Sequence, residues 1–181
     1  FAEWIHQSLL KQYGDDLDEL GLQVTTTLDG QLQQTANDAL QAQIKIAAVT
    51  WEKCIAATAV HYINDVSADM AEFSNGAFAD RGNFVNLAKH WAELKGFALG
   101  LQFSALSPFR DGSTGKSITD LKRALDLMGD APMMPDGSQN GQPTTAASAD
   151  DAIAGYLSDL QEARTILSEA YGFNPDAVAI W

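Results

Sequence analysis

The chain has 181 residues, with 24 acidic and 11 basic side chains, so its formal net charge at pH 7 is -13. This charge argues strongly against a nucleic-acid partner, because binding to phosphates needs clustered Lys and Arg, and it disfavours docking on anionic lipid through a basic patch. Hydrophobic residues make up 46% of the chain, which is enough to build a core and excludes disorder throughout.

Cys54 is the only cysteine in the sequence, so an internal disulfide bond and a cysteine-based zinc site are both excluded. It falls within an apolar, helix-like stretch, and we expect its side chain to be buried.

No run of 18 apolar residues is present, so the sequence predicts no transmembrane segment. The chain begins at Phe1 without an initiator Met or a signal-peptide pattern, and we therefore expect it to be a processed or truncated part of a longer protein.

The first 30 residues predict one helix followed by an ambiguous segment. Residues 1–13 have a helical pattern that ends at Gly14, where glycine is a common stop signal. Residues 15–30 are ambiguous, because the run from Val24 to Thr27 favours a strand while its neighbours favour a helix.

The strongest periodic signal in the sequence runs from about Ala36 to Phe73. Apolar or small residues recur at spacings of three and four, as on one face of a helix: Leu40, Ile44, Ala47, Trp51, Ile55, Thr58, Tyr62 and Val66. A capping box at Thr35–Asp38 is expected to begin this helix, and the run from Ser74 to Gly76 is expected to end it.

Three further helices are expected in the second half of the chain. They are Gly82–Ser104, a helix from the capping box at Ser117–Asp120 to Gly129, and a helix from Ser148–Asp151 to Gly172, with Pro175 just beyond. Two irregular segments, residues 106–116 and 130–147, lie on either side of the middle helix. The longer one contains three prolines, and we expect it to be a mobile loop rather than a domain boundary.

These elements predict an all-α fold. We expect a single helical-bundle domain over residues 1–181, built from four to five helices with long irregular loops. Aromatic residues at helical spacings are expected to lie in its core, namely Trp51, Tyr62, Phe84, Trp91, Phe97 and Phe103. The run from Tyr171 to Phe173 and the final residue, Trp181, are expected to anchor the C-terminus on the bundle.

Two familiar kinds of active site are not indicated. The run from Gly112 to Ser117 has only two residues before Gly-Lys-Ser, whereas a phosphate-binding P-loop has four and follows a buried strand. We therefore expect a flexible loop that leads into a helix cap. A nucleophilic hydrolase is equally poorly supported, because the sequence has no Gly-x-Ser-x-Gly motif and only three histidines, His6, His61 and His90.

A metal site is the chemical hypothesis that the residues favour. His90 and Glu93 are three residues apart on one predicted helix, so both side chains can reach one ion, and His61 and Asp65, four apart on another, form a second such pair. Imidazole and carboxylate ligands together suit a divalent transition metal, Zn, Fe or Mn, better than calcium. The alternative is that each pair is only a hydrogen-bonded contact within the fold.

Gly96 and Gly100 follow the His90 pair on the same predicted helix. Glycine inside a helix costs about 1 kcal/mol relative to alanine, so some feature of the fold must compensate for it. The first explanation is close approach of another helix. The alternative is room for a ligand beside His90 and Glu93.

Three blocks of the sequence resemble, in order and spacing, bacterial extracytoplasmic lipoproteins of unknown function that are similar to the imelysin-like proteins. The blocks are ATAVHYIN at 57–64, KHWAELKGF at 89–97, and AR through EAYGF within 163–173, and the resemblance covers roughly residues 43–181. It implies a helical protein based on four-helix bundles, with a His-x-x-Glu metal motif that maps onto His90 and Glu93.

The same resemblance implies a periplasmic or cell-surface protein with a lipid anchor upstream of Phe1, a protein partner in the cell envelope, and a connection to iron or haem acquisition. Some relatives have been called peptidases, but this chain lacks the His-Glu-x-x-His arrangement of a zinc peptidase. Our leading hypothesis is therefore a non-catalytic protein that binds metal through His90, Glu93, His61 and Asp65. The alternative is a structural or protein-interaction module without metal.

Overall fold

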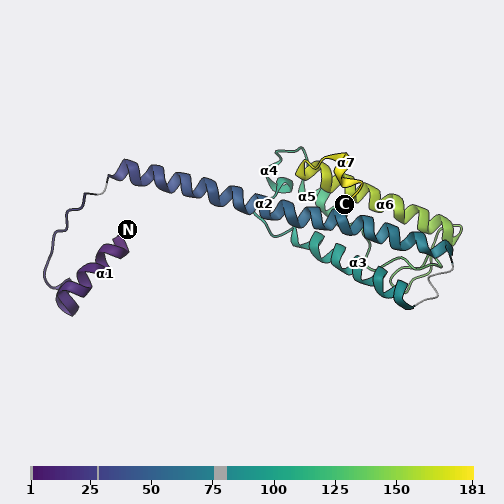
Figure 1. Ribbon diagram of the computed structural model, residues 1–181, viewed down its shortest axis with the longest axis horizontal. Coiled ribbons are helices and arrows are strands. Elements are labelled where there is room, and N and C mark those ends of the chain that lie inside the picture. Colours follow the sequence, from purple (N-terminus) through teal and green to yellow (C-terminus); the bar gives the residue numbers. More distant parts are fainter. Residues whose placement is uncertain (1, 28, 76–80) are drawn as a thin grey trace. The chain divides into compact units, whose positions relative to one another are not determined.

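The computed structural model describes residues 2–27, 29–75 and 81–181. The chain divides into two compact units, Phe1–Gln41 and Ala42–Trp181. Within the described residues, seven α-helices and two short 3-10 helices account for the regular structure, together with isolated bridges and no strand (Figure 1). The all-α prediction is confirmed.

The first unit contains the helix that the sequence predicts at the N-terminus. Helix α1 spans Ala2–Tyr13 and is followed by the 3-10 helix η1, Gly14–Asp18, with Gly14 in the left-handed region at a φ of 67°. Phe1 lies outside the described residues. The run from Val24 to Thr27 is irregular and not a strand, because β propensity gives no ladder without a partner strand beside it.

Helix α2, Gly30–Ala71, begins earlier than the sequence predicts. The side chain of Asp29 accepts hydrogen bonds from the amides of Gln31 at 2.9 Å and Leu32 at 3.0 Å, which makes Asp29 the N-terminal cap. The predicted capping box at Thr35 is wrong, since Thr35 lies inside the helix and donates to the carbonyl of Gln31 at 3.0 Å. Residues 31–34, between the observed and the predicted start of the helix, have good helix propensity but no apolar periodicity. The periodic signal therefore begins later than the helix itself.

The end of α2 is followed by the 3-10 helix η2, Glu72–Asn75, so the α-helix stops just before the predicted signal at Ser74–Gly76. Gly76 lies outside the described residues.

The remaining α-helices are α3, Arg81–Gly100; α4, Pro108–Asp111; α5, Ile118–Leu127; α6, Ala149–Tyr171; and α7, Pro175–Val178. Helix α3 is shorter than predicted at its C-terminal end, and α4 is a single turn inside the predicted loop 106–116.

The predicted caps of α5 and α6 are confirmed. Ser117 and Asp120 form a capping box, in which the Asp120 carboxylate accepts from the Ser117 amide at 2.7 Å. Ser148 accepts from the amide of Asp151 at 3.1 Å, and Gly172 ends α6 in the left-handed region at a φ of 61°. These signals act between residues a few positions apart, and for that reason the sequence reveals them.

One apolar core holds the second unit together. Most of its buried side chains come from four helices, including Ala56, Val60, Ile63 and Val66 of α2, Leu87, Leu94 and Ala98 of α3, Leu121, Ala124 and Leu125 of α5, and Leu160, Ala163, Ile166 and Leu167 of α6. The pairs Asp69–His90 and Tyr62–Phe97 show that α3 runs antiparallel to α2, as Figure 1 also shows.

The C-terminus is anchored on α2, as predicted. The side-chain amide of Asn64 donates to the carbonyls of Val178 and Trp181, both at 2.9 Å, and its oxygen accepts from Arg164 of α6 at 2.6 Å. The Trp181 ring also packs against Phe173, with ring centroids 5.0 Å apart. One polar residue of α2 therefore holds both α6 and the end of the chain.

Several predicted core residues are not buried. Cys54 is exposed, and so are the aromatic side chains of Trp51, Phe84, Phe97 and Phe103, with Trp51 at 73% and Phe103 at 85% exposure. The prediction is wrong for these residues, because helical spacing shows which side chains share a face but not which face another helix covers. Tyr62 and Trp91 are half-buried against the core, as expected.

The segment 130–147 is irregular, as predicted, and carries turns and two isolated bridges, Met133–Gln139 and Gln139–Gln142. Met133 is buried, and Gly137 lies so close to α6 that an added Cβ would stand 3.0 Å from the Cβ of Ala152. Part of this loop therefore packs on the bundle. Its mobility stays a prediction.

The predicted close helix packing at Gly96 and Gly100 is wrong. A Cβ built on either residue comes within 4 Å of no described atom other than those of its chain neighbours and the nearby backbone of its own helix, and both residues are exposed. The described structure therefore gives no packing reason for glycine at these positions.

We expect Gly96→Ala to raise the free energy of unfolding by about 0.5–1 kcal/mol, because alanine gains helix propensity here without a clash. Gly172→Ala is the opposite control, since its left-handed backbone should make alanine cost about 1 kcal/mol or more. Urea denaturation of the two single variants measures both effects. A destabilised Gly96→Ala variant would show that this position has a contact that the structure lacks.

Candidate functional site

His90 of α3 is paired with a carboxylate of α2 that the sequence analysis did not select. Its Nδ1 lies 2.7 Å from Oδ2 of Asp69, and both side chains are about one-fifth exposed, at 23% and 21%. A contact of this length between imidazole and carboxylate is a strong, charge-assisted hydrogen bond when the imidazole is protonated. The pair ties α3 to α2.

Tyr62 of α2 lies against the same imidazole. Its ring centroid is 6.0 Å from that of His90 and 5.9 Å from that of Phe97, with interplanar angles of 30° and 12°. Loss of solvent, a hydrogen bond with Glu93 and the negative charges of Glu93 and Asp65 together raise the pKa of the Tyr62 phenol. The phenol is therefore neutral at physiological pH, and its ring contributes an aromatic surface between the two helices.

Glu93 lies one turn after His90 but does not share its hydrogen bond. Its Oε2 is 4.0 Å from Nζ of Lys89, which is close enough for an ion pair but too long for a hydrogen bond. The same oxygen is buried, and within the described residues it has no hydrogen-bond partner. One carboxylate oxygen of this site is therefore unsatisfied among the described residues.

His61 and Asp65 form a separate pair within α2. Nε2 of His61 lies 3.2 Å from Oδ2 of Asp65, and the side chains are 47% and 32% exposed. The His61 ring contacts Tyr62 at 5.1 Å between centroids, so the Tyr62 ring contacts both imidazoles. The sequence prediction that His61 and Asp65 interact at a spacing of four residues is consistent with this geometry.

The four predicted metal ligands are therefore distributed over three separate contacts, His90 with Asp69, Glu93 with Lys89, and His61 with Asp65. Across the part of the chain that the structure describes, no three His, Cys, Asp or Glu side chains are grouped so that they could hold one metal ion. Sequence reasoning missed Asp69, although a signal for it exists: His61, Asp65 and Asp69 are four residues apart and share one face of α2. The partner helix could not be identified from that spacing.

The rest of the His90 segment is used for packing against α5. Nζ of Lys95 donates to the carbonyls of Leu125 at 2.7 Å and Gly129 at 2.6 Å, where the end of α5 leaves carbonyls without helical partners. Loss of solvent lowers the pKa of Lys95, while the charges of Asp130 and Asp126 oppose that effect. Lys95 is therefore a cap for another helix.

Trp91 completes the contact with the end of α5. Its Nε1 donates to the carbonyl of Met128 at 3.0 Å and to the Tyr156 hydroxyl at 3.1 Å, and that hydroxyl donates to the same carbonyl at 2.8 Å. Burial raises the pKa of Tyr156, which stays protonated and able to donate. Helices α3 and α6 thus supply donors to the carbonyls at the end of α5, and this explains why polar residues follow His90.

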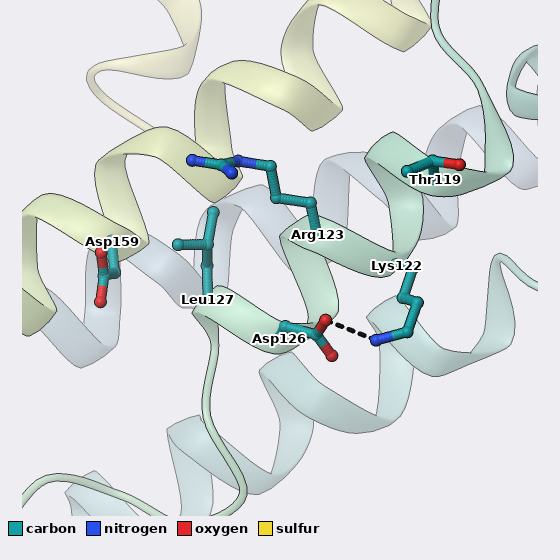
Figure 2. Close-up of a pocket in the computed structure, with 6 residues that line it drawn as sticks. All are labelled: Thr119, Lys122, Arg123, Asp126, Leu127 and Asp159. Atoms are coloured by element: carbon teal, nitrogen blue, oxygen red, sulfur yellow. Dashed lines mark hydrogen bonds and ion pairs between the residues drawn. The ribbon is translucent and has the colours of Figure 1, made fainter.

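A hollow of about 400 Å³ lies on α5 and α6. Figure 2 shows the residues that line it, Thr119, Lys122, Arg123, Asp126, Leu127 and Asp159. Three of its charged side chains form ion pairs, Lys122 with Asp126 and Arg123 with Glu162, each at 2.5 Å. Loss of solvent and the charge of Glu162 raise the pKa of Asp159. The pair of Arg123 with Glu162 joins α5 to α6, as expected of a structural contact.

Comparison with known proteins adds no family assignment. No protein-family model, curated protein or solved structure matches this chain. The likeness to imelysin-like proteins consequently depends on the three sequence blocks alone. Among the described helices, none combines the length and the apolar character needed to cross a membrane.

We expect Lys95→Met to lower the free energy of unfolding by about 1–3 kcal/mol, because two carbonyls at the end of α5 lose their charged donor. Lys122→Met is the matched control: its ammonium forms an exposed ion pair with Asp126, and its loss should cost less than about 0.5 kcal/mol. Chemical denaturation compares the two variants. Equal effects would contradict the capping role of Lys95.

Proposed function

We propose that this chain is a structural or protein-interaction module in which residues of the His90 site lock α3 onto α2. The observation that carries the proposal is the 2.7 Å contact between His90 Nδ1 and Asp69 Oδ2, which joins two helices. The stacking of Tyr62 on His90 and Phe97 adds an aromatic contact across the same two helices. Each histidine of the predicted site has its own carboxylate partner, as a structural role requires.

An exposed apolar face on α2 supports the interaction part of the proposal. Ile44, Ala48 and Trp51 are spaced four and three residues apart, so they lie on one side of the helix, and all three are exposed. Ile44 is 52% exposed and Trp51 is 73% exposed. Contiguous apolar surface of this kind is typical of helices that bind a partner helix through one face.

The cellular setting is proposed from the sequence blocks. Their resemblance to imelysin-like lipoproteins supports an extracytoplasmic location, with a lipid anchor upstream and a protein partner in the cell envelope. The structure contributes a four-helix core in Ala42–Trp181, the architecture that this resemblance implies.

A second candidate function is transition-metal binding at His90, and two observations favour it. Asp69 holds Nδ1 of His90, which leaves Nε2 for a ligand, and metal-binding histidines are commonly oriented by a carboxylate on the other nitrogen. The buried Oε2 of Glu93, three residues away on α3, makes no hydrogen bond with any described residue. Zn, Fe or Mn would suit this ligand set, and the resemblance connects such a site to iron or haem acquisition.

For the structural module, we expect the double variant His90→Ala, Glu93→Ala to lose about 1 kcal/mol or more of unfolding free energy, because it breaks a polar contact between helices. The double variant His61→Ala, Asp65→Ala is matched in residue types, but it removes an exposed pair within one helix and should lose less than about 0.5 kcal/mol. Urea denaturation in metal-free buffer compares them. Similar losses of unfolding free energy in both variants would contradict the proposal that the His90 site holds α3 on α2.

For the metal site, we expect protein treated with a chelating resin to take up about one Zn, Fe or Mn ion per chain through His90 and Glu93. The measurement is elemental analysis after dialysis, followed by calorimetric titration. The His90→Ala, Glu93→Ala variant should lose this uptake, and the His61→Ala, Asp65→Ala variant should lose it only if His61 or Asp65 also supplies a ligand. If the wild-type chain takes up none of the three metals, the metal-site proposal is wrong, whereas the proposal of a structural module is unaffected.

A further inference from the structure

A cavity of about 280 Å³ lies between the start of the second unit and the end of α6. None of its lining residues belongs to the His90 site. They come from α2 (Lys45, Val49, Lys53), from the segment around α4 (Leu106, Pro108, Asp111, Ser113, Thr114) and from the end of α6 (Ala170, Tyr171, Gly172). Its volume is slightly below that of sites for drug-sized molecules, so its ligand must be small.

Two lysines of α2 face this cavity in an otherwise acidic chain. Lys45, Val49 and Lys53 are each four residues apart, so they form one row on the helix, with an apolar side chain between two ammonium groups. Among the described residues, neither lysine forms an ion pair with a carboxylate. The Lys53 ammonium lies over the Phe173 ring, 5.5 Å from its centroid, which holds it near the end of α6.

The opposite wall is a structured loop that carries hydroxyl groups. The Asp111 carboxylate accepts from the Ser113 amide at 2.9 Å, which shapes the turn that carries Ser113 and Thr114. Hydrogen bonds from Ser113, followed by the charge of Lys45, lower the pKa of Asp111. The ion pair between Lys116 and Glu169, at 2.5 Å, fastens the end of this loop to α6.

Tyr171 forms a rigid part of the wall, and a buried carboxylate stands behind it. The Tyr171 hydroxyl donates to Oε1 of Glu52 at 2.6 Å, and the side chains of Tyr171 and Glu52 are 6% and 5% exposed. The other oxygen, Oε2, is buried without a hydrogen-bond partner among the described residues. The hydrogen bond to Glu52 fixes the Tyr171 side chain in the wall.

We propose that this cavity binds a small dicarboxylic acid, with one carboxylate on Lys45, the other on Lys53 and the carbon chain against Val49. The alternation of ammonium, aliphatic and ammonium groups along α2 matches the alternation of carboxylate, methylene and carboxylate in such a molecule. Ser113 and Thr114 offer hydroxyl donors from the opposite wall. The Asp111 carboxylate in the same lining opposes the binding of any anion, so binding depends on engaging both lysines at once, which a dicarboxylate can do and a single inorganic anion cannot.

This inference is independent of the proposed function, and titration of the whole chain with glutarate tests it. In metal-free buffer we expect calorimetry to give a dissociation constant of about 1 mM or tighter, and amide NMR shifts to be largest around Ser113 and Thr114. Uncharged glutaramide, acetate and inorganic phosphate should each bind about tenfold more weakly than glutarate. The His90→Ala, Glu93→Ala variant should bind glutarate like the wild type.

The decisive variants are Lys45→Met and Lys53→Met, each of which should weaken glutarate binding about tenfold. Lys122→Met removes the same charge from α5, outside the cavity, and should leave the affinity unchanged. Circular dichroism melting confirms that the three variants are folded. No glutarate binding, equal binding of phosphate, or an equal loss in Lys122→Met would each overturn the proposal.

Discussion

The burial of one aliphatic stripe of α2 is the constraint on which the second unit depends. Val60, Ile63 and Val66 are completely buried, and they fix the rotation of the helix about its axis. Once that rotation is fixed, it also fixes the directions in which the neighbouring polar residues of α2 point. Tyr62 and Asp69 meet α3, whereas Asn64 meets α6 and the C-terminus. The polar contacts are thus a consequence of how the apolar face is buried.

This arrangement explains why α2 is rich in side chains that resemble a functional site. A helix with neighbours on two sides needs polar groups at the edges of its buried stripe, and these groups must be satisfied by the neighbours. The Asp69–His90 and Asn64–Arg164 contacts meet that need. The buried Oε2 atoms of Glu93 and Glu52 differ, because neither makes a hydrogen bond with a described residue.

The charged side chains are also distributed unevenly over the structure. The chain as a whole is strongly acidic, and several of its lysines are used inside the fold: Lys95 caps α5, and Lys116 holds the α4 loop on α6. Lys45 and Lys53 differ because they face a cavity without an ion pair to any described carboxylate. In an acidic protein, two such lysines around an apolar residue form a local site for anions. The net charge of the chain does not reveal such a site.

The sequence by itself determined the local features of this protein. The helix caps at Ser117, Ser148 and Gly172, and the His61–Asp65 contact, are interactions between residues within one turn or so, and spacing along the chain is sufficient to predict them. Only the tertiary structure decided that His90 meets Asp69, that Lys95 caps α5, and that Trp51 and Phe103 stay exposed. The physical reason is that a periodic pattern fixes which residues share a helix face, while the identity of the neighbour on that face depends on how the helices pack.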